Sequence, residues 1–488
     1  MIDFKGGLSR PFYIYFSGDF MKKKLLSLFT MIISLILMLT AFPVTTFAAA
    51  DFNVEDGILL SYKGNSQSVT IPSDVYYIAD SAFEGNSSIT TVNLNNTSVI
   101  GNKAFANCTS LKTVTGSGNV SACGAYSFYN TPFLKSYNSK SLVMGSVLVY
   151  STEPDDVIID SGVVSIAPYA FSYNTAITSV RIGDNVASIG EGAFYNCTKL
   201  SEAIVSKRVT YIGAFAFEGT KFLSAVDDDF LVLGNGILVD VNSKATDITI
   251  PDSVCQIGAG AFYNNKSLVK VTIPDTVTSI GMRAFAGCTS LRDAMLPQNL
   301  VLLDKEAFSG CTSLESVIIP ASVAAIGESA FLGCTSLKTA QVLSSTSVSD
   351  GMFASCTGLE SVMLSQGAER IGDYAFYNCK KLSELSVPPS VNIVSDTAFS
   401  GADNAAVWCA ESSMIELYCV SNGIDAYIIG DANKDGNINI RDATDIQKST
   451  AKILTMDFSS CLRGDADFSG DINIRDATAI QKYVAGIN

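Results

Sequence analysis

The sequence predicts a β-rich solenoid of stacked repeats, followed by a small helical module made of two similar units. Phenylalanine recurs at a spacing of 22 or 23 residues through most of the chain, and a fixed period in this range is typical of a solenoid. The chain then closes on GDANKDGNINIRDATDIQK at 430–448 and GDADFSGDINIRDATAIQK at 464–482, two copies of one motif that begin 34 residues apart. We therefore expect two different kinds of domain.

Each recurring phenylalanine marks the same position of one repeat. Most neighbours in the series are one period apart, and the two longer gaps, of 43 and 45 residues, are close to two periods. The series comprises Phe83, Phe105, Phe128, Phe171, Phe194, Phe217, Phe262, Phe285, Phe308, Phe331, Phe353, Phe376 and Phe399.

The repeat at 268–285, LVKVTIPDTVTSIGMRAF, shows how one turn is expected to fold. Val271 and Ile273 alternate with other residues, which indicates a short strand with every second side chain facing inward. Pro274 follows this strand and ends it. One turn is too small to bury its own apolar side chains, so the stacked turns must share one continuous core.

Three stretches, at 55–72, 144–160 and 234–251, lack the phenylalanine element. We expect each of them to be a hairpin at which the array restarts. Residues 401–429 are expected to form a strand, a short helix and a last strand that cap the open end of the solenoid.

The N-terminal region resembles a targeting segment rather than part of the fold. Residues 21–50 begin with Lys22, Lys23 and Lys24, continue with an apolar stretch, and end in small residues that suit cleavage. This pattern predicts a secretory signal peptide, and a membrane anchor is the alternative. Residues 1–20 are expected to be an over-called start. No later apolar stretch is long enough to span a bilayer, so we expect a secreted, extracellular or surface-associated protein without a stable membrane span after cleavage.

The composition excludes several classes of function. The formal net charge is -15, and such an acidic chain is a poor nucleic-acid binder because that affinity rests on Lys and Arg neutralising phosphates. The chain contains no histidine, which excludes Ser-His-Asp and Cys-His catalysis. We therefore expect no enzyme in the repeat array.

The twelve cysteines are placed by the repeat. Seven of them stand three residues after a landmark phenylalanine, where other repeats have Asn or Thr, so we expect buried free thiols that hydrogen-bond to the loop backbone. Cys409 and Cys419 lie outside this phase, and for them a disulfide stays open. The seven are Cys108, Cys197, Cys288, Cys311, Cys334, Cys356 and Cys379.

The exposed positions of the array give no sequence-level site. Tyr129, Tyr195, Tyr263 and Tyr377 each follow a landmark phenylalanine by one, but they are scattered among turns and are expected to form no contiguous stripe. A protein or glycan ligand on the broad face is reasonable for a solenoid, and its identity stays open.

The segment IPDTVTSIGMRAFAGCTSL at 273–291 resembles the BspA-type leucine-rich repeat, and the resemblance extends over residues 53–400. It implies a leucine-rich-repeat solenoid over 51–400 that is predominantly β, with short or absent convex helices. It also implies a surface or secreted protein of a family often linked to adhesion, whose repeats carry no catalytic residues.

The duplicated ending has the spacing of two calcium-binding loops. Oxygen-bearing side chains at positions 1, 3, 5, 9 and 12 and a glycine at position 6 match the loop of an EF-hand, in which a hard cation takes six to eight oxygens. An acidic glycine-rich loop without metal is the alternative, and two matches in one phase argue against it. We therefore expect two calcium ions, held by Asp431, Asn433, Asp435, Asn437, Asn439 and Asp442, and by Asp465, Asp467, Ser469, Asp471, Asn473 and Asp476.

A helix is expected after each loop, at 443–451 and 477–484, whereas only a strand precedes the first loop. This pair of half-hands resembles a type I dockerin over residues 430–488. The resemblance implies binding to a cohesin module of a scaffoldin. The family's recognition positions fall on Ile440, Arg441, Gln447 and Lys448, and on Ile474, Arg475, Gln481 and Lys482. The usual Ser-Thr pair is absent, which leaves the identity of the cohesin open, and the two identical sets suggest two binding orientations.

These expectations favour a secreted, non-catalytic interaction protein that a dockerin attaches to a cellulosome-type polysaccharide-degrading or cell-surface complex. One alternative is a dockerin-borne glycoside hydrolase, which needs two carboxylates about 5–10 Å apart in a cleft. The other is an adhesin directed at a host or a substrate.

Overall fold

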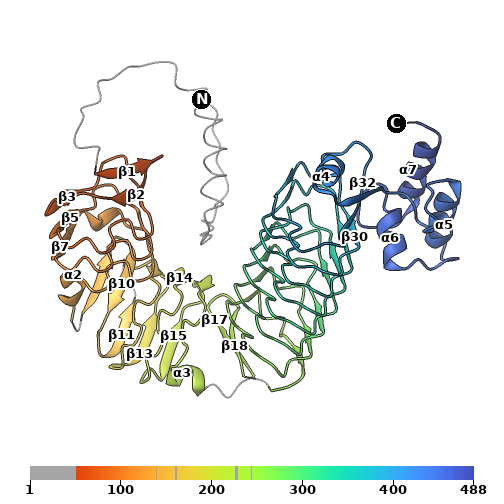
Figure 1. Cartoon of the computed structure of the whole chain (residues 1–488). Coiled ribbons are helices and arrows are strands. Elements are labelled where there is room, and N and C mark those ends of the chain that lie inside the picture. Colours follow the sequence, from red (N-terminus) through yellow and green to blue (C-terminus); the bar gives the residue numbers. More distant parts are fainter. Residues whose placement is uncertain (1–50, 139, 160–161, 226–228, 243, 488) are drawn as a thin grey trace, which may run out of the picture. The chain divides into compact units, whose positions relative to one another are not determined.

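The computed structural model describes residues 51–138, 140–159, 162–225, 229–242 and 244–487 (Figure 1). The expected signal peptide and over-called start lie outside these residues. From Phe52 onward the chain forms one unit. Its repeats form three sub-arrays, each opened by an antiparallel hairpin, as the sequence predicted: β1–β2, β9–β10 and β17–β18.

The first sub-array runs from β1 to α2. Its elements are β1 (Phe52–Glu55), β2 (Ile58–Tyr62), β3 (Ser68–Thr70), β4 (Tyr77–Ile78), β5 (Thr91–Asn93), β6 (Val99–Ile100), β7 (Thr113–Thr115), the 3-10 helix η1 (Ser117–Asn119), β8 (Ala122–Cys123) and α2 (Pro132–Lys135).

The second sub-array runs from β9 to α3. Its elements are β9 (Ser141–Met144), β10 (Val147–Ser151), β11 (Asp155–Ile159), β12 (Ser165–Ile166), β13 (Ile177–Ile182), β14 (Ser188–Ile189), β15 (Glu202–Val205), β16 (Tyr211–Ile212) and α3 (Lys221–Ser224).

The third sub-array runs from β17 to β33. Its elements are β17 (Phe230–Leu233), β18 (Ile237–Val241), β19 (Asp247–Thr249), β20 (Gln256–Ile257), β21 (Lys270–Thr272), β22 (Ser279–Ile280), β23 (Asp293–Met295), β24 (Leu302–Leu303), β25 (Ser316–Ile319), β26 (Ala325–Ile326), β27 (Thr339–Val342), β28 (Ser361–Leu364), β29 (Arg370–Ile371), β30 (Glu384–Ser386), β31 (Ile393–Val394), β32 (Ala406–Cys409), α4 (Met414–Asn422) and β33 (Asp425–Ile428).

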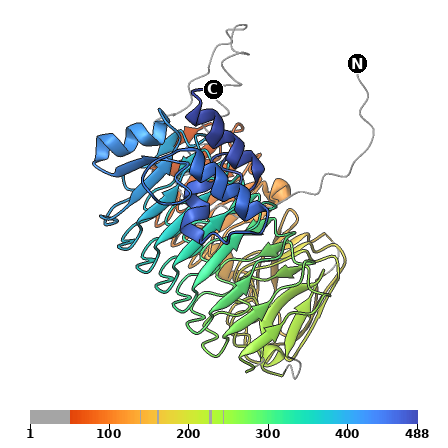
Figure 2. The same ribbon diagram turned by 90° about the vertical axis from the view of Figure 1, so that its right-hand side faces the viewer.

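Apart from the hairpins, the strands pair in parallel with the equivalent strand of the next coil. The longer strands form sheets such as β3-β5-β7 and β25-β27-β28-β30-β32-β33, and the two-residue strands form a separate series such as β20-β22-β24-β26, which continues from β18. Figure 2 shows the strands of the third sub-array as a row of parallel arrows. This is the predominantly β solenoid that the sequence predicted.

The inward side chains follow the predicted alternation. Val271 and Ile273 are both buried. The landmark phenylalanines stack within each sub-array, with ring centroids between 4.6 and 5.8 Å apart. The stack is interrupted between Phe128 and Phe171 and between Phe217 and Phe262, where the buried residues of each inserted hairpin are divided between the two neighbouring hydrophobic cores.

Short helices occur where a sub-array ends. Thr131 and Thr220 occupy the phase that holds cysteine elsewhere, and their hydroxyls accept from the backbone N–H groups of Leu134 and Leu223. This N-cap stabilises α2 and α3, because it satisfies an amide that the first helical turn leaves unpaired. At the other end, β32, α4 and β33 supply the strand, helix and strand that were expected over 401–429.

The C-terminal module contains α5 (Ile440–Thr450), α6 (Phe458–Gly464) and α7 (Ile474–Val484). The helices that follow the two loops, α5 and α7, pack against each other through fully buried side chains: Ala443, Ile446, Ala477 and Ile480. The expectation of a bare loop-plus-helix unit is wrong for the second copy, because α6 directly precedes its loop.

The α6 helix also contacts the third sub-array. The guanidinium of Arg463 lies 4.3 Å from the Trp408 ring centroid, and its Nη2 donates to Glu384 Oε1 at 2.8 Å. The backbone N–H of Gln366 donates to the Phe468 carbonyl at 2.8 Å. The second unit is therefore the one that packs on the repeats.

Among the residues that the structure describes, none of the helices is both long and apolar enough to cross a membrane.

Candidate functional site

The first loop folds around the carboxylate of Asp431. Its Oδ1 accepts from the N–H of Asp435 at 3.0 Å, and its Oδ2 accepts from the N–H of Gly436 at 3.1 Å. Gly436 has a φ of 80°, a conformation that costs glycine little. The Asp442 carboxylate closes the loop, because it accepts from the N–H groups of Asn433 at 3.1 Å and Asn439 at 2.9 Å.

The second loop repeats this pattern bond for bond. Asp465 accepts from the N–H groups of Ser469 and Gly470, both at 2.9 Å. Asp476 accepts from Asp467 N–H at 3.2 Å, and its second oxygen accepts from Asn473 N–H at 2.9 Å. Identical geometry in two copies indicates that the loop conformation is a property of the motif rather than of its surroundings.

Each loop leads directly into a helix. Asn439 and Asn473, at position 9, are the N-cap residues of α5 and α7, and their side chains accept from the N–H groups of Arg441 and Arg475 at 2.9 Å. Asp442 and Asp476, at position 12, complete the capping boxes. The same carboxylates therefore close the loops and begin the helices.

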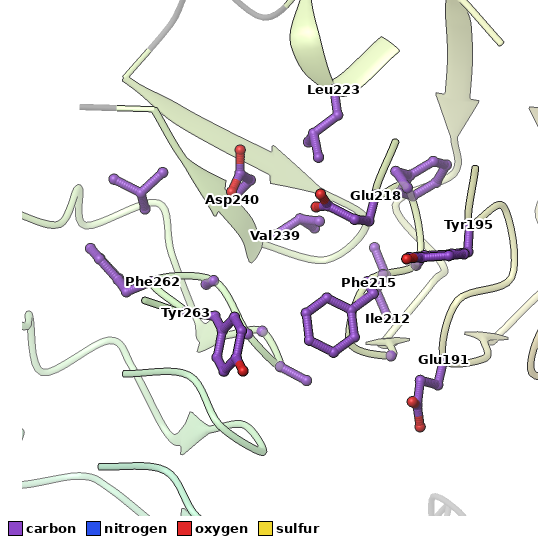
Figure 3. A pocket seen from close by; sticks show the side chains of 18 of the residues that line it. Glu191, Tyr195, Ile212, Phe215, Glu218, Leu223, Val239, Asp240, Phe262 and Tyr263 are labelled. Carbon is purple, nitrogen blue, oxygen red and sulfur yellow. The ribbon is translucent and has the colours of Figure 1, made fainter. Parts of the chain in front are cut away.

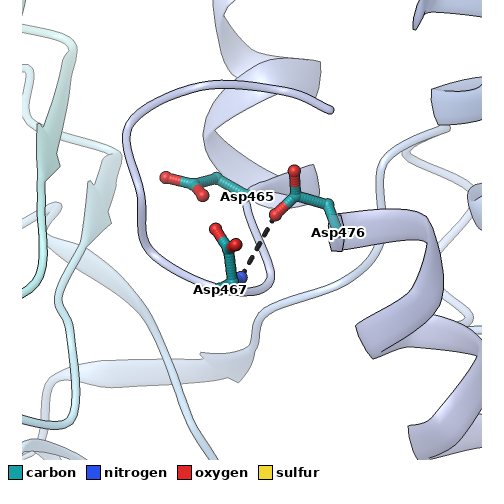
Figure 4. A group of neighbouring side chains, drawn as sticks. All are labelled: Asp465, Asp467 and Asp476. Carbon is teal, nitrogen blue, oxygen red and sulfur yellow. Dashed lines mark hydrogen bonds between the residues drawn. The ribbon is translucent and has the colours of Figure 1, made fainter. Parts of the chain in front are cut away.

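Three carboxylates of the second loop converge. Asp465, Asp467 and Asp476 each offer an oxygen within 4.8 Å of the others (Figure 4). Burial, together with the neighbouring carboxylate charges, raises the pKa of Asp465 to about 7 and that of Asp476 to about 6. Buried like charges at this distance disfavour the ionised forms, and a bound cation would offset this. The set consists of oxygen donors, which suits a hard cation such as Ca²⁺.

The two loops differ at three of the predicted ligand positions, where the first has Asn433, Asp435 and Asn437 and the second has Asp467, Ser469 and Asp471. At Asn433 an amide oxygen therefore replaces the carboxylate of Asp467. Burial also raises the pKa of Asp442, and the Asp431 and Asp435 charges add to this effect. Asn437 and Asp471, at position 7, present backbone carbonyls that accept from the side-chain amides of Asn439 and Asn473 at 3.1 Å. Three of the predicted oxygen donors converge in the second loop, and the role of both loops in binding calcium stays a prediction.

The residues expected to meet a cohesin lie at equivalent positions of α5 and α7. Ile440 and Ile474, the first residues of the two helices, are 55% and 54% exposed, which is high for isoleucine. Seven of the eight are exposed and Gln481 is half-buried: Ile440, Arg441, Gln447, Lys448, Ile474, Arg475, Gln481 and Lys482. Their binding role also stays a prediction.

Among the ring contacts of the described residues, the four tyrosines that follow a landmark phenylalanine do not meet one another, but other aromatic side chains lie beside them. The Tyr126 ring stacks on Tyr169 at a centroid distance of 4.7 Å and meets Tyr129 at 6.0 Å, and Tyr173 meets Tyr195 at 5.7 Å. The sequence argument considered only the position after each phenylalanine. Tyr126 and Tyr169 stand two residues before theirs, and the inserted hairpin does not separate them in space.

A protein-family model described as BspA type leucine rich repeat region matches residues 60–146, 144–228, 241–360 and 346–422. These segments make up more than half of the 488 residues. A search of curated proteins found no match.

Several solved structures are similar to the repeat array at low identity. A leucine rich cell surface protein from Faecalibacterium prausnitzii is 21% identical, over 79% of this chain and 98% of that one, with a TM-score of 0.29. A leucine-rich repeat protein from Bacteroides ovatus is 20% identical, over 80% and 100%, with a TM-score of 0.33. The pneumococcal vaccine antigen PcpA is 15% identical, over 77% and 95%, with a TM-score of 0.32.

Proposed function

Because the chain belongs to the BspA-type leucine-rich repeat family, we propose that it is a secreted, non-catalytic interaction protein whose repeats carry a binding surface and whose residues 430–488 form a type I dockerin. The family match describes a repeat region rather than a catalytic domain. In this proposal the dockerin attaches the array to a cohesin on a scaffoldin, within a cellulosome-type polysaccharide-degrading or cell-surface complex.

The observation that supports the dockerin most strongly is the equal hydrogen bonding of the two loops. In both copies the first aspartate accepts from the N–H groups at positions 5 and 6, and the last aspartate accepts from those at positions 3 and 9. A bound cation would offset the cost of burying Asp442, Asp465 and Asp476, since burial disfavours their charge.

Calcium has a structural role in this proposal. Asp431, Asp435 and Asp442 would hold one ion, and Asp465, Asp467 and Asp476 would hold the other, with the remaining predicted oxygens completing each shell. The binding free energy at a site that is absent from the unfolded chain stabilises the folded chain. Calcium would therefore fix α5 and α7 against each other and keep the exposed residues of both helices in place for a cohesin.

The test is cohesin capture by the full chain with and without a chelator. Captured chain is measured on a panel of immobilised type I cohesins, and amide hydrogen exchange follows folding. We expect excess EDTA to abolish capture and to remove the protection of amides in 440–450 and 474–484, while those of 262–399 stay protected. EDTA saturated with calcium is the control. Undiminished capture in excess EDTA, or capture by none of the cohesins in calcium, contradicts the proposal.

A further inference from the structure

A cavity of about 850 Å³ lies where the last turns of the second sub-array meet the first turn of the third. Its volume is within the range of ligand pockets. Figure 3 shows Phe215 and Tyr263 beside each other in this cavity, with Glu218 and Asp240 close to one another on one side and Glu191 on another. We refer to it as the aromatic pocket.

The aromatic side chains of the pocket come from turns that are far apart in the sequence. Phe215 and Tyr263 meet edge to face at 5.6 Å, across the hairpin that opens the third sub-array. Tyr126, Tyr169 and Tyr173 line the pocket from the preceding turns. Tyr173 is 64% exposed and Tyr263 is 45% exposed. Such exposure leaves much of their surface free for a ligand.

Several of these rings are held on strained backbone. Tyr126, Tyr169, Tyr173 and Phe215 have φ values of 56°, 60°, 61° and 57°, a left-handed conformation that is uncommon for bulky residues. Gly192 gives the Tyr169 ring its room, because a Cβ there would lie 2.4 Å from Tyr169 Cε1. The same conformation recurs at equivalent positions of other coils, such as Ser81, Lys103 and Asn196, so it is a feature of the repeat rather than of this pocket.

The pocket also contains unneutralised negative charge. Burial raises the pKa of Asp240, and the nearby Glu218 carboxylate adds to this effect. Glu191 accepts a hydrogen bond from the Tyr169 hydroxyl at 2.8 Å. Among the ion pairs found in the described residues, none includes Glu191, Glu218 or Asp240.

The nearby cations do not balance this charge. Arg283 is paired with Glu306 at 2.6 Å, and Lys244 is the one basic residue among the described residues that line the pocket. Three carboxylates and one ammonium therefore share the cavity with the faces and edges of aromatic rings. Aromatic faces and carboxylates both attract cations, and a guanidinium or ammonium over a tyrosine is a recurring binding arrangement.

We propose that the aromatic pocket binds arginine or lysine side chains of a basic segment on a protein partner. This inference rests on the proposed role of the array as an interaction surface, and it gives that surface a partner chemistry. A glycan would also stack on tyrosine rings, but it would not relieve the repulsion between Glu218 and Asp240. The charge therefore favours a cationic peptide over a neutral sugar.

The test uses a capped hexa-arginine peptide and cellohexaose as probes, titrated into the full chain by calorimetry. We expect the peptide to bind and the sugar not to bind. Tyr173→Gly should weaken peptide binding about threefold to tenfold. It should not lower thermal stability, because glycine accepts this φ without strain. Glu218→Gln should weaken binding to a similar extent, and more so at low salt.

Two matched variants act as controls. Tyr374→Gly removes an exposed tyrosine with a φ of 55° outside the pocket, and Glu315→Gln removes an exposed carboxylate of the third sub-array. Neither should change peptide binding. Equal weakening by the controls would mean general attraction to an acidic chain and would overturn the proposal, as would cellohexaose binding that depends on Tyr173. Cohesin capture measured on the same variants distinguishes loss of this pocket from failure of the proposed dockerin.

Discussion

At the residue scale, one position of the repeat is reserved for a small hydrogen-bonding side chain. The thiol of Cys311 donates to the Phe285 carbonyl of the preceding coil at 3.1 Å, and Asn174 donates to the Glu153 carbonyl at 2.7 Å in the same way. The seven cysteines of this phase share that bond. They tie each coil to its neighbour, and they are free thiols, as the sequence predicted.

This arrangement predicts thiols that are protected until the array unfolds. Burial raises the pKa of Cys197 and Cys288 to about 12, so almost no reactive thiolate exists at neutral pH. We expect Ellman's reagent to modify half-buried Cys255 and Cys461 first and the seven repeat thiols only in denaturant. Cys255→Ser together with Cys461→Ser should remove the early reaction. Rapid modification of all thiols in the native protein would contradict this account.

Residue-scale sequence reasoning found the core and missed the aromatic pocket. The core positions held by cysteine and phenylalanine can be recognised in the sequence because the same residue recurs there at a fixed spacing. The pocket depends on Tyr126 and Tyr169, which occupy a position where other turns have Ser81, Lys103 or Gly192. A position with variable occupants gives no periodic signal, and only the stacking of coils brings its few tyrosines together.

At the element scale, the strands and hairpins follow from local pattern, whereas α6 does not. Its sequence, FSSCLRG, contains two serines and a terminal glycine, and these residues favour a helix weakly. The helix is stabilised from outside itself: Asp457 caps its N-terminus, buried Leu462 packs beside Trp408, and Arg463 contacts Glu384. A local stretch of sequence does not show tertiary contacts of this kind, so they could not be used to predict α6.

The loops give a second prediction. Asp465→Asn keeps the shape of the side chain and removes one of three convergent charges, so calcium affinity should fall by about tenfold or more. Asp431→Asn should act similarly in the first loop. Asp445→Asn, an α5 carboxylate outside the predicted ligand set, is the matched control and should bind calcium normally. Calorimetric titration of the calcium-free chain measures all three, and equal affinities would argue against these ligands.

The contact between α6 and the repeats gives a third prediction. Burial alone would raise the pKa of Glu384, but hydrogen bonds from Ser459, Arg463 and Ser361 and the Arg463 charge outweigh it and lower the pKa. A carboxyl with a lowered folded-state pKa stabilises the fold above its unfolded pKa, which is about 4.3. This contribution disappears as the pH falls through the folded-state value.

Glu384→Gln should therefore destabilise the contact by about 1–3 kcal/mol at neutral pH. The difference from the wild-type chain should shrink as the pH is lowered below about 4, since the wild-type carboxyl then becomes protonated as well. Thermal melts across pH 3–7 measure this difference. Glu360→Gln, at an exposed residue of the preceding coil, should show no such dependence. A difference that is constant with pH would mean that the pair contributes little charge interaction.

At the scale of the whole molecule, the repeat array and the C-terminal module bury their apolar side chains in different ways. The array stacks coils that cannot bury their apolar faces alone, and its sub-arrays extend one fold. The module instead pairs two units whose buried alanines and isoleucines meet between α5 and α7. In the described part of the chain the second unit packs on the array, where Gly470 lies against Leu343 and Ser365. The predicted docking residues of both units nevertheless stay exposed, apart from half-buried Gln481.

This exposure allows two equivalent orientations of a cohesin, which gives the last prediction. If either face alone suffices, Arg441→Ala with Lys448→Ala should weaken capture only about twofold, because one of two equal modes is lost. Arg475→Ala with Lys482→Ala should do the same, and the four changes together should abolish capture. Surface plasmon resonance on the cohesin that binds the wild-type chain measures this, with Lys452→Ala on the loop after α5 as the control. Abolition by either pair alone would exclude two modes, and a strong effect of only one pair would mean that the array or the cohesin selects one face.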